Sequence, residues 1–310
     1  MMNINPALVI LGNGFDLANG YKTRYSDFYK SNDFTSLVKT NRLASYINSQ
    51  NIDRWADLET CLFHYSQEIT RKYGVGNAIQ SILFKKNYFE LKQALFNYLA
   101  KESHNSVEVS ASSLIRSLLI EWSKLNPVYL TFNYTIITPC GIFGNNRVYL
   151  NTDDSINNNV FIYQHGSIYD TKDAEQNVPG NLVLGIDKEI QRVEDIHSFL
   201  YKEEQPVFNI ESLQHTIANR NVYIIYGWSF GVSDTKYIKM LFNPDYKGKT
   251  YIIYAYDDYS LKGIRGNLNT YITPDFLDKN KVLFILQSDK CIIWKTNKEV
   301  SALLDKEGEE

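Results

Sequence analysis

Short apolar runs alternate with amphipathic stretches along the chain, and this pattern predicts an α/β fold. The first run, Ala7–Leu11, is wholly apolar and is followed at once by Gly12, which is typical of a buried strand. Strands that alternate with helical stretches form a mostly parallel sheet with helices on both faces, so we expect a Rossmann-like architecture. Similar runs predict further strands at Val128–Phe132, Val148–Leu150, Val160–Tyr163, Leu182–Leu184, Val222–Tyr226, Tyr251–Tyr256, Lys281–Leu286 and Cys291–Trp294.

A long helical region separates the first two predicted strands. From about Ser26 to Lys124, apolar residues recur at three- and four-residue spacing, with polar breaks expected near 48–53, 74–77 and 101–106. We interpret this region, residues 26–124, as a helical insertion that caps a single α/β domain covering residues 1–310. Later helical patterns lie at Glu189–Glu203, Glu211–Asn219 and Asp234–Leu241, and a hairpin could form from Val148–Leu150 and Val160–Tyr163.

The composition is that of a globular protein and argues against several other classes. The 310 residues are 44% hydrophobic and carry a net charge of -3, so the chain lacks the basic excess that non-specific nucleic-acid binding requires. Cys61, Cys140 and Cys291 are too widely spaced for a zinc ribbon or a disulfide framework, and we expect no bound metal. The N-terminus lacks a basic region and no apolar stretch is long enough to span a bilayer, so we expect a soluble, cytoplasmic protein without a membrane partner.

Four polar or glycine-rich motifs follow directly after predicted strands. In an open parallel sheet, the carboxyl ends of the strands form the edge at which ligands bind. One such junction is ordinary turn chemistry, but four in one chain predict a binding site at that edge. The motifs are Gly12-Asn13-Gly14-Phe15-Asp16, Thr131-Phe132-Asn133-Tyr134-Thr135, Gln164-His165-Gly166-Ser167, and Gly227-Trp228-Ser229-Phe230-Gly231 followed by Asp234.

The first motif has the features of a phosphate-binding turn. Gly12 and Gly14 let the chain turn sharply and bring backbone N–H groups close to a ligand, and a helix that starts near Asp16 would add partial positive charge. The dinucleotide fingerprint has a third glycine three residues after the second, where this chain has Leu17. A tight strand–helix turn without a ligand is therefore the alternative.

Asn133 and His165 are the candidate catalytic residues. Asn133 offers a donor and an acceptor and can orient a water or a ribose hydroxyl, although it is equally suited to capping a helix or fixing a turn. His165 titrates near neutral pH and is the candidate base, with a surface or core role as the alternative. Gly227 and Ser229 could approach a phosphate or adenosine, or could belong to a helix N-cap.

Two acidic stretches are weaker candidates. Asp57 and Glu59 lie two residues apart on a predicted helix, so they do not share a helical face and do not form a paired acid and base. We expect both to be exposed, although one of them could face the cleft. Asp257 ends a predicted strand, where an acid can bind ribose hydroxyls or can occupy an exposed turn.

Together, these motifs resemble the AbiH family of bacterial phage abortive-infection proteins. The resemblance rests on GNGFDLANGYKTRYSDF, then W-x-D-x-E, TFNYT, a strand ending in HG, and GWSFGVSD, in that order from Gly12 to about Asp234. AbiH proteins in turn resemble the sirtuin-type NAD-binding fold. The resemblance therefore implies an anti-phage role and a sheet that binds NAD.

The sirtuin resemblance implies roles for individual residues. By that resemblance His165 is the general base and Asn133 positions a water or ribose. Sirtuin-like motifs place an aspartate two residues after the asparagine, where this chain has Thr135, and the deacylases carry a four-cysteine zinc module that is absent here. With the residues argued above, the expected nucleotide-binding set is Gly12, Asn13, Gly14, Phe15, Asp16, Asp27, Gly166, Gly227, Ser229 and Asp257.

The sequence therefore favours an NAD glycohydrolase-like defence effector, an enzyme that breaks the nicotinamide N-glycosidic bond. One alternative is a module that senses NAD or ADP-ribose without catalysis, which the missing aspartate favours. Another is a toxin directed at nucleic acid, against which the acidic balance argues. NAD is the expected ligand, and a homo-oligomer or a phage-triggered partner is a further expectation.

Overall fold

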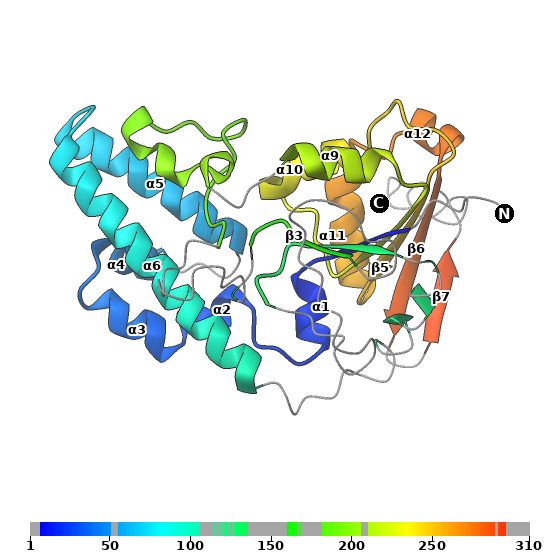
Figure 1. Ribbon diagram of the computed structural model, residues 1–310, viewed down its shortest axis with the longest axis horizontal. Coiled ribbons are helices and arrows are strands. Elements are labelled where there is room, and N and C mark those ends of the chain that lie inside the picture. Colours follow the sequence, from blue (N-terminus) through cyan, green and yellow to red (C-terminus); the bar gives the residue numbers. More distant parts are fainter. Residues whose placement is uncertain are drawn as a thin grey trace, which may run out of the picture.

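Apolar runs of the chain form the strands of one sheet in the computed structural model (Figure 1). The structure describes residues 7–50, 55–105, 115, 118–119, 121–122, 125, 127–135, 160–166, 168, 182–205, 210–288 and 291–295. Its strands are β1 (Leu8–Leu11), β2 (Val128–Thr131), β3 (Val160–Tyr163), β4 (Val222–Tyr226), β5 (Thr250–Ala255), β6 (Lys281–Ser288) and β7 (Cys291–Lys295).

The strand order is that of a doubly wound sheet. Among the described strands the order is β3-β2-β1-β4-β5-β6-β7, with β1 to β6 parallel and β7 antiparallel to β6. The chain builds outward from β1 to β3 and then returns to the other side of β1 with β4. This reversal creates a topological switch point between β1 and β4, where such sheets bind ligands. The expected Rossmann-like α/β class is confirmed.

Alternate residues of the strands pack on opposite faces of the sheet. Leu8 and Ile10 of β1 belong to one core, whereas Val9 and Leu11 belong to the core on the other face. Burial on both faces explains why these strands are apolar throughout and do not alternate with polar residues. Helices cover both faces, with α9 (Ile210–Ala218), α10 (Thr235–Leu241), α11 (Asp258–Leu268) and α12 (Pro274–Lys279) on the first and α1 (Asn13–Ala18) on the second.

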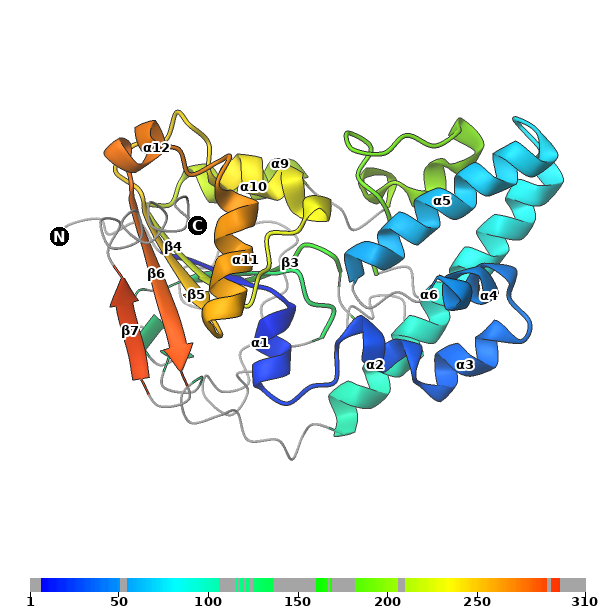
Figure 2. The ribbon, with the colours of Figure 1, turned by 180° about the vertical axis from the view of Figure 1, so that it is seen from behind.

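Five helices between β1 and β2 form a second group, which we call the helical lobe together with residues 182–205. They are α2 (Tyr25–Tyr29), α3 (Asn32–Val38), α4 (Arg42–Ser49), α5 (Trp55–Tyr73) and α6 (Ala78–Asn105). The lobe has its own apolar core, which includes Phe28, Phe34 and Leu62. Figures 1 and 2 show the lobe lying beside the sheet. None of the described helices is both long and apolar enough to cross a membrane.

Residues 182–184 do not form the strand that their apolar pattern predicts. They join no ladder of the sheet, and they are buried among the residues of the lobe. Neighbouring side chains take the place of strand partners. The hydroxyl of Tyr134 donates to the carbonyl of Val183 at 2.9 Å. The side-chain amide of Gln205 donates to the carbonyl of Leu184 at 2.7 Å, so the backbone is satisfied without a sheet.

The single helix expected at Glu189–Glu203 is also wrong. The structure has a turn and two 3-10 helices there, η3 (Asp195–Leu200) and η4 (Lys202–Glu204). Extended backbone at Glu194 (ψ 150°) and Tyr201 (ψ 129°) interrupts the helical path. The chain is redirected at Tyr201, and the next residue, Lys202, is buried.

Other expected boundaries differ in smaller ways. α6 continues through the break expected near 101–106 and ends at Asn105. β3 pairs in parallel with β2. The other arm of the expected hairpin, residues 148–150, lies outside the described part of the chain, so the hairpin stays a prediction. The structure also contains α11 and α12, which the sequence pattern did not predict.

Candidate active site

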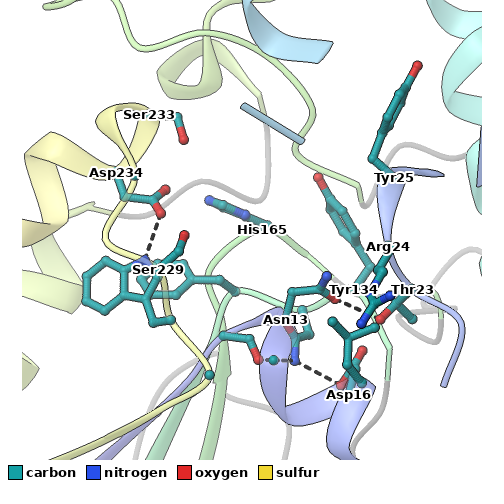
Figure 3. Close-up of a pocket in the computed structure, with 18 of the residues that line it drawn as sticks. Asn13, Asp16, Thr23, Arg24, Tyr25, Tyr134, His165, Ser229, Ser233 and Asp234 are labelled. Atoms are coloured by element: carbon teal, nitrogen blue, oxygen red, sulfur yellow. Dashed lines mark hydrogen bonds between the residues drawn. The ribbon is translucent and has the colours of Figure 1, made fainter. Parts of the chain in front are cut away.

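A cavity of about 540 Å³ lies at the carboxyl edge of the sheet, where the sheet meets the helical lobe (Figure 3). Residues that follow the parallel strands β1, β2, β3 and β4 line it, among them Gly12, Asn133, His165 and Gly227. The lobe contributes Glu59 of α5. The four strand-end motifs, far apart in the sequence, therefore meet at one cavity beside the switch point of the sheet.

The glycines of the first and fourth motifs are required by close backbone packing. A Cβ at Gly12 would lie 2.5 Å from the carbonyl oxygen of Gly227, and a Cβ at Gly14 would lie 2.7 Å from the Cα of Gly227. Gly227 has φ +69°, a left-handed conformation that favours glycine. Side chains at these positions would push the two turns apart.

This packing limits the first turn as a phosphate cradle. The N–H of Gly14 donates to the carbonyl of Gly227 at 2.9 Å, and the N–H of Phe15 donates to the carbonyl of Gly12 at 2.9 Å. Both amides are therefore occupied within the protein, and α1 has only six residues. A ligand phosphate would need additional donors elsewhere in the cavity.

Asn133 is held in one orientation by its neighbours. Its side-chain amide donates to the carbonyl of Gly12 at 3.1 Å and to Oδ1 of Asp16 at 2.9 Å. The reversed amide would set its oxygen against these two acceptors, so the hydrogen bonds determine the orientation. Because both amide hydrogens are used, Asn133 offers its carbonyl oxygen, an acceptor, to a ligand.

Asp16 is a buried carboxyl group held by neutral donors. In addition to Asn133, the hydroxyl of Thr135 donates to Oδ2 of Asp16. The carboxyl group that Thr135 contacts belongs to Asp16 on α1. Burial raises the pKa of Asp16 to about 7, although the hydrogen bonds from Thr135 and Asn133 lower it. We refer to Asp16, Asn133 and Thr135 as the Asp16 cluster.

His165 presents a basic nitrogen to the cavity. A ring N–H donates to the backbone carbonyl of Phe132, and Nε2 has no hydrogen-bond partner among the described residues. We assign the ring proton to Nδ1 on this basis, so that Nε2 keeps its lone pair. Figure 3 shows the ring directed into the cavity, toward the side on which Asp234 lies.

The surroundings of His165 keep it uncharged. Burial is the main cause that lowers the pKa of His165 well below its usual value, and the positive charge of Lys202 lowers it further. The hydrogen bond to Phe132 acts in the opposite direction. His165 is consequently neutral at neutral pH and able to accept a proton at Nε2.

A second group of charged side chains lies where the helical lobe meets the sheet. Oε1 of Glu59 lies 2.7 Å from Nζ of Lys202, whose side chain is only 3% exposed. Asp234, at the end of η5 (Val232–Asp234), accepts a hydrogen bond from the indole of Trp228 at 2.7 Å. Burial raises the pKa of Glu59 to about 7 and also raises that of Asp234, while the charge of Lys202 lowers both. We refer to Glu59, Lys202 and Asp234 as the Glu59 cluster.

Aromatic rings complete the wall near His165. The ring of Phe132 is centred 4.8 Å from that of Trp228 and 5.4 Å from that of His165. These rings give the cavity an apolar surface beside its polar groups, a combination that is typical of small-molecule sites. Within the described residues, no group of three or more histidine, cysteine, aspartate or glutamate side chains is placed to hold a metal ion.

Most of the residues expected at the site do line the cavity. Phe15 and Gly166 do not: Phe15 is fully buried and packs edge-on against Tyr226 at 5.7 Å, and Gly166 forms a turn with φ +75°. The expected residues that line the cavity are Gly12, Asn13, Gly14, Asp16, Asn133, His165, Gly227 and Ser229.

Asp27 and Asp257 also lie outside the cavity lining, and each caps a helix. Oδ2 of Asp27 accepts a hydrogen bond from the N–H of Arg24 at 3.1 Å, at the start of α2. Oδ1 of Asp257 accepts one from the N–H of Ser260 at 2.7 Å, at the start of α11. Their contacts are those of capping boxes, which satisfy free backbone donors at helix starts.

The helical lobe and the segment before it supply cavity residues that lie outside the four strand-end motifs. Glu59 lines the cavity. From the sequence we expected an exposed position, with the cleft as the alternative. Arg24 belongs to the opening block GNGFDLANGYKTRYSDF, so that block was a signal that could have identified it. The additional lining residues from this part of the chain are Thr23, Arg24, Tyr25, Glu59, Leu99 and Leu184.

One family model matches the chain. It is described as bacteriophage abortive infection AbiH, and it matches residues 8–256, well over half of the 310 residues. The matched range contains every residue found to line the cavity except Asn267. No curated protein matches the chain.

Proposed function

The chain belongs to the bacteriophage abortive infection AbiH family, and we propose that it serves that defence by hydrolysing NAD at the nicotinamide N-glycosidic bond. Family membership gives the setting, anti-phage defence. The choice of reaction is inferred from the fold and from the polar groups of the cavity.

The fold supports a nucleotide ligand. The strand order and the switch point between β1 and β4 are those of sheets that bind dinucleotides at their carboxyl edge. The cavity lies at this edge, and its volume of about 540 Å³ is in the range of small-molecule sites. Arg24, an exposed side chain on the lining, is a cation that can contact the diphosphate.

One observation carries the proposed reaction. The two candidate catalytic side chains both offer acceptors, Oδ1 of Asn133 and Nε2 of His165, because their N–H groups are already used within the protein. Two acceptors at one cavity suit a group that donates two hydrogens, such as a water molecule or the hydroxyls of a ribose. They do not suit an anion.

The proposed step uses these acceptors. A water, oriented by Asn133, adds to C1′ of the nicotinamide ribose and passes its proton to Nε2 of His165. The bond between C1′ and the nicotinamide nitrogen breaks, and its electron pair leaves with nicotinamide. The ribose develops oxocarbenium character, as in sugar hydrolysis. Nicotinamide leaves as a neutral molecule, so the step needs no strong general acid, and the products are nicotinamide and ADP-ribose.

The test is to incubate the purified protein with NAD and to quantify nicotinamide and ADP-ribose by liquid chromatography. We expect product from the wild type and a fall in rate of about 100- to 10,000-fold for His165→Ala, the usual range for loss of a general base. Binding of NAD, measured by calorimetry, should be largely retained in that variant.

His215→Ala is the matched control, because His215 is exposed on α9 and does not line the cavity. Its turnover should equal that of the wild type. Wild-type protein that binds NAD without forming product would instead support the alternative of a sensing module. Equal turnover by His165→Ala and the wild type would remove His165 from the mechanism.

A further inference from the structure

The charged residues that line the cavity are mostly acidic. Arg24 is exposed, whereas the acidic side chains are largely buried. Lys202 pairs with Glu59 but is not among the lining residues, so it lies behind the carboxyl groups that meet the cavity. In the described part of the chain, the charged side chains of the lining are Arg24, Asp16, Glu59 and Asp234.

The protein compensates this negative charge only in part. One lysine, Lys202, serves both Glu59 and Asp234, and the hydrogen-bond donors to Asp16 are neutral. Burial accordingly raises the pKa of all three carboxyl groups. A positively charged group in the cavity would supply the missing counter-charge, since opposite charges attract strongly where water is excluded.

His165 gives an independent indication that a ligand occupies this space. It is only 9% exposed, it lines the same cavity, and its Nε2 has no hydrogen-bond partner among the described residues. A buried polar atom in a folded protein normally has a partner, so the unmatched Nε2 marks a position for a ligand or water. The neutral ring adds no positive charge that would oppose a cationic ligand.

We propose that the carboxyl-lined part of the cavity selects ligands that carry a positively charged ring, of which pyridinium N-glycosides are the chemical class. The proposal rests on the proposed function in that NAD is the pyridinium nucleotide concerned. Oxidised NAD carries this positive ring, whereas NADH has a neutral ring of nearly the same size. Selection by charge separates the two redox forms already at binding, whereas hydrolysis separates them only when the bond breaks, because the ring of NADH cannot leave as a neutral molecule.

The experiment compares the binding of carba-NAD and NADH by calorimetry with the wild-type protein. In carba-NAD a methylene group replaces the ring oxygen of the nicotinamide ribose, so the pyridinium charge is kept and the bond resists cleavage. We expect carba-NAD to bind about tenfold more tightly than NADH. In Asp234→Asn and in Glu59→Gln, each of which replaces a carboxyl group of the cavity with a neutral amide, the ratio should fall about threefold or more.

Asp275→Asn is the matched control. It removes one carboxylate from the exposed helix α12, away from the cavity lining, and should leave the ratio unchanged. Melting temperatures check that each variant is folded, and two independent variants protect the test against the failure of one.

Three outcomes would overturn the proposed selection. They are equal affinity for the two ligands, an affinity ratio that neither variant changes, and no binding of carba-NAD. Turnover of NAD by the wild type is measured separately. Selective binding without turnover would leave charge selection standing and contradict the proposed hydrolysis. Turnover of NAD without selective binding would support the proposed hydrolysis and contradict charge selection.

Discussion

The Asp16 cluster and the Glu59 cluster solve the same problem in different ways. Each places a carboxyl group in the wall of the cavity, out of bulk water. Asp16 is held by the neutral amide of Asn133 and the neutral hydroxyl of Thr135, all three from the sheet body. Glu59 comes from the helical lobe and lies 2.7 Å from a buried lysine, Lys202.

The two clusters give their carboxyl groups a similar pKa. Burial raises the pKa of both Asp16 and Glu59 to about 7. A lysine would be expected to keep a carboxyl pKa low, but Lys202 is shared with Asp234 and desolvation is the larger effect. The comparison teaches that burial, more than the nearest partner, sets the pKa of each group.

The largest expected effect comes from Lys202→Met. Methionine keeps much of the side-chain volume but leaves the carboxyl groups of Glu59 and Asp234 without their shared cation. Breaking a buried ion pair typically costs about 3–5 kcal/mol, so we expect the free energy of unfolding at pH 7 to fall by that amount. Urea unfolding measures it.

The same variant at pH 5 is an internal control for Lys202→Met. Glu59, whose pKa is about 7, is then protonated, so the cost of losing the lysine should shrink. A cost below about 1 kcal/mol at pH 7 would mean that water screens the pair. The Glu59 cluster would then not differ from a surface ion pair.

Asp16→Asn is expected to change the pH dependence of stability. The pKa of Asp16 is about 7 in the folded protein and near 3.8 when unperturbed. A group whose pKa is raised on folding contributes stability that is fully present below pH 4 and is lost as pH rises through 7. The wild type should therefore lose up to about 1.4 kcal/mol per pH unit relative to the variant across this window.

The measurement for Asp16→Asn is a series of urea unfolding curves between pH 4 and pH 8 for both proteins. Asparagine keeps the shape of the side chain, and the hydroxyl of Thr135 can accept a hydrogen bond from its amide, so the fold should be preserved. Parallel curves of stability against pH would show that Asp16 has an ordinary pKa. That result would weaken the contrast between the two clusters.

Local patterns in the sequence predicted the sheet and the sheet side of the cavity. An apolar run followed by a polar or glycine-rich break is a local signal, and it placed Asn133, His165 and Gly227 at strand ends. The parallel order of the strands then brings these ends together. The same signal misled at residues 182–184, because an apolar run buried in the helical lobe looks like one buried in a sheet.

The lobe side of the cavity was not predictable in this way. Glu59 reaches the cavity because α5 packs against η5 and the chain after Tyr201 places Lys202 beside it, neither of which is encoded in local spacing. Asp257 shows an ambiguity that local spacing does not resolve. An acid after a strand is equally consistent with ribose binding and with a helix cap, and the nearby Ser260 completes a capping box.

Thr135→Val tests the Asp16 cluster, in which the hydrogen-bond donors to the carboxyl group are neutral. Valine has the shape of threonine but cannot donate, so one oxygen of the buried Asp16 carboxyl group loses its hydrogen bond. Leaving a buried acceptor unsatisfied costs about 1–3 kcal/mol, and we expect a loss of stability of that size at pH 8. Thr35→Val is the control, because its exposed hydroxyl donates only to the carbonyl of Ser31, and its cost should be below about 0.5 kcal/mol.

The smallest expected effect is that of Lys279→Met. This variant tests whether burial, and not the distance between the charged atoms, determines how much an ion pair stabilises the protein. Nζ of Lys279 lies 2.6 Å from Oδ2 of Asp275, as close as Lys202 lies to Glu59, but the two side chains are 32% and 69% exposed. Exposed pairs four residues apart on a helix contribute about 0.3–0.5 kcal/mol, so urea unfolding should show a loss of that size. If Lys279→Met and Lys202→Met cost the same, burial would not be what distinguishes the Glu59 cluster. The partial charge compensation on which the selection of a cationic ring depends would then lose its basis.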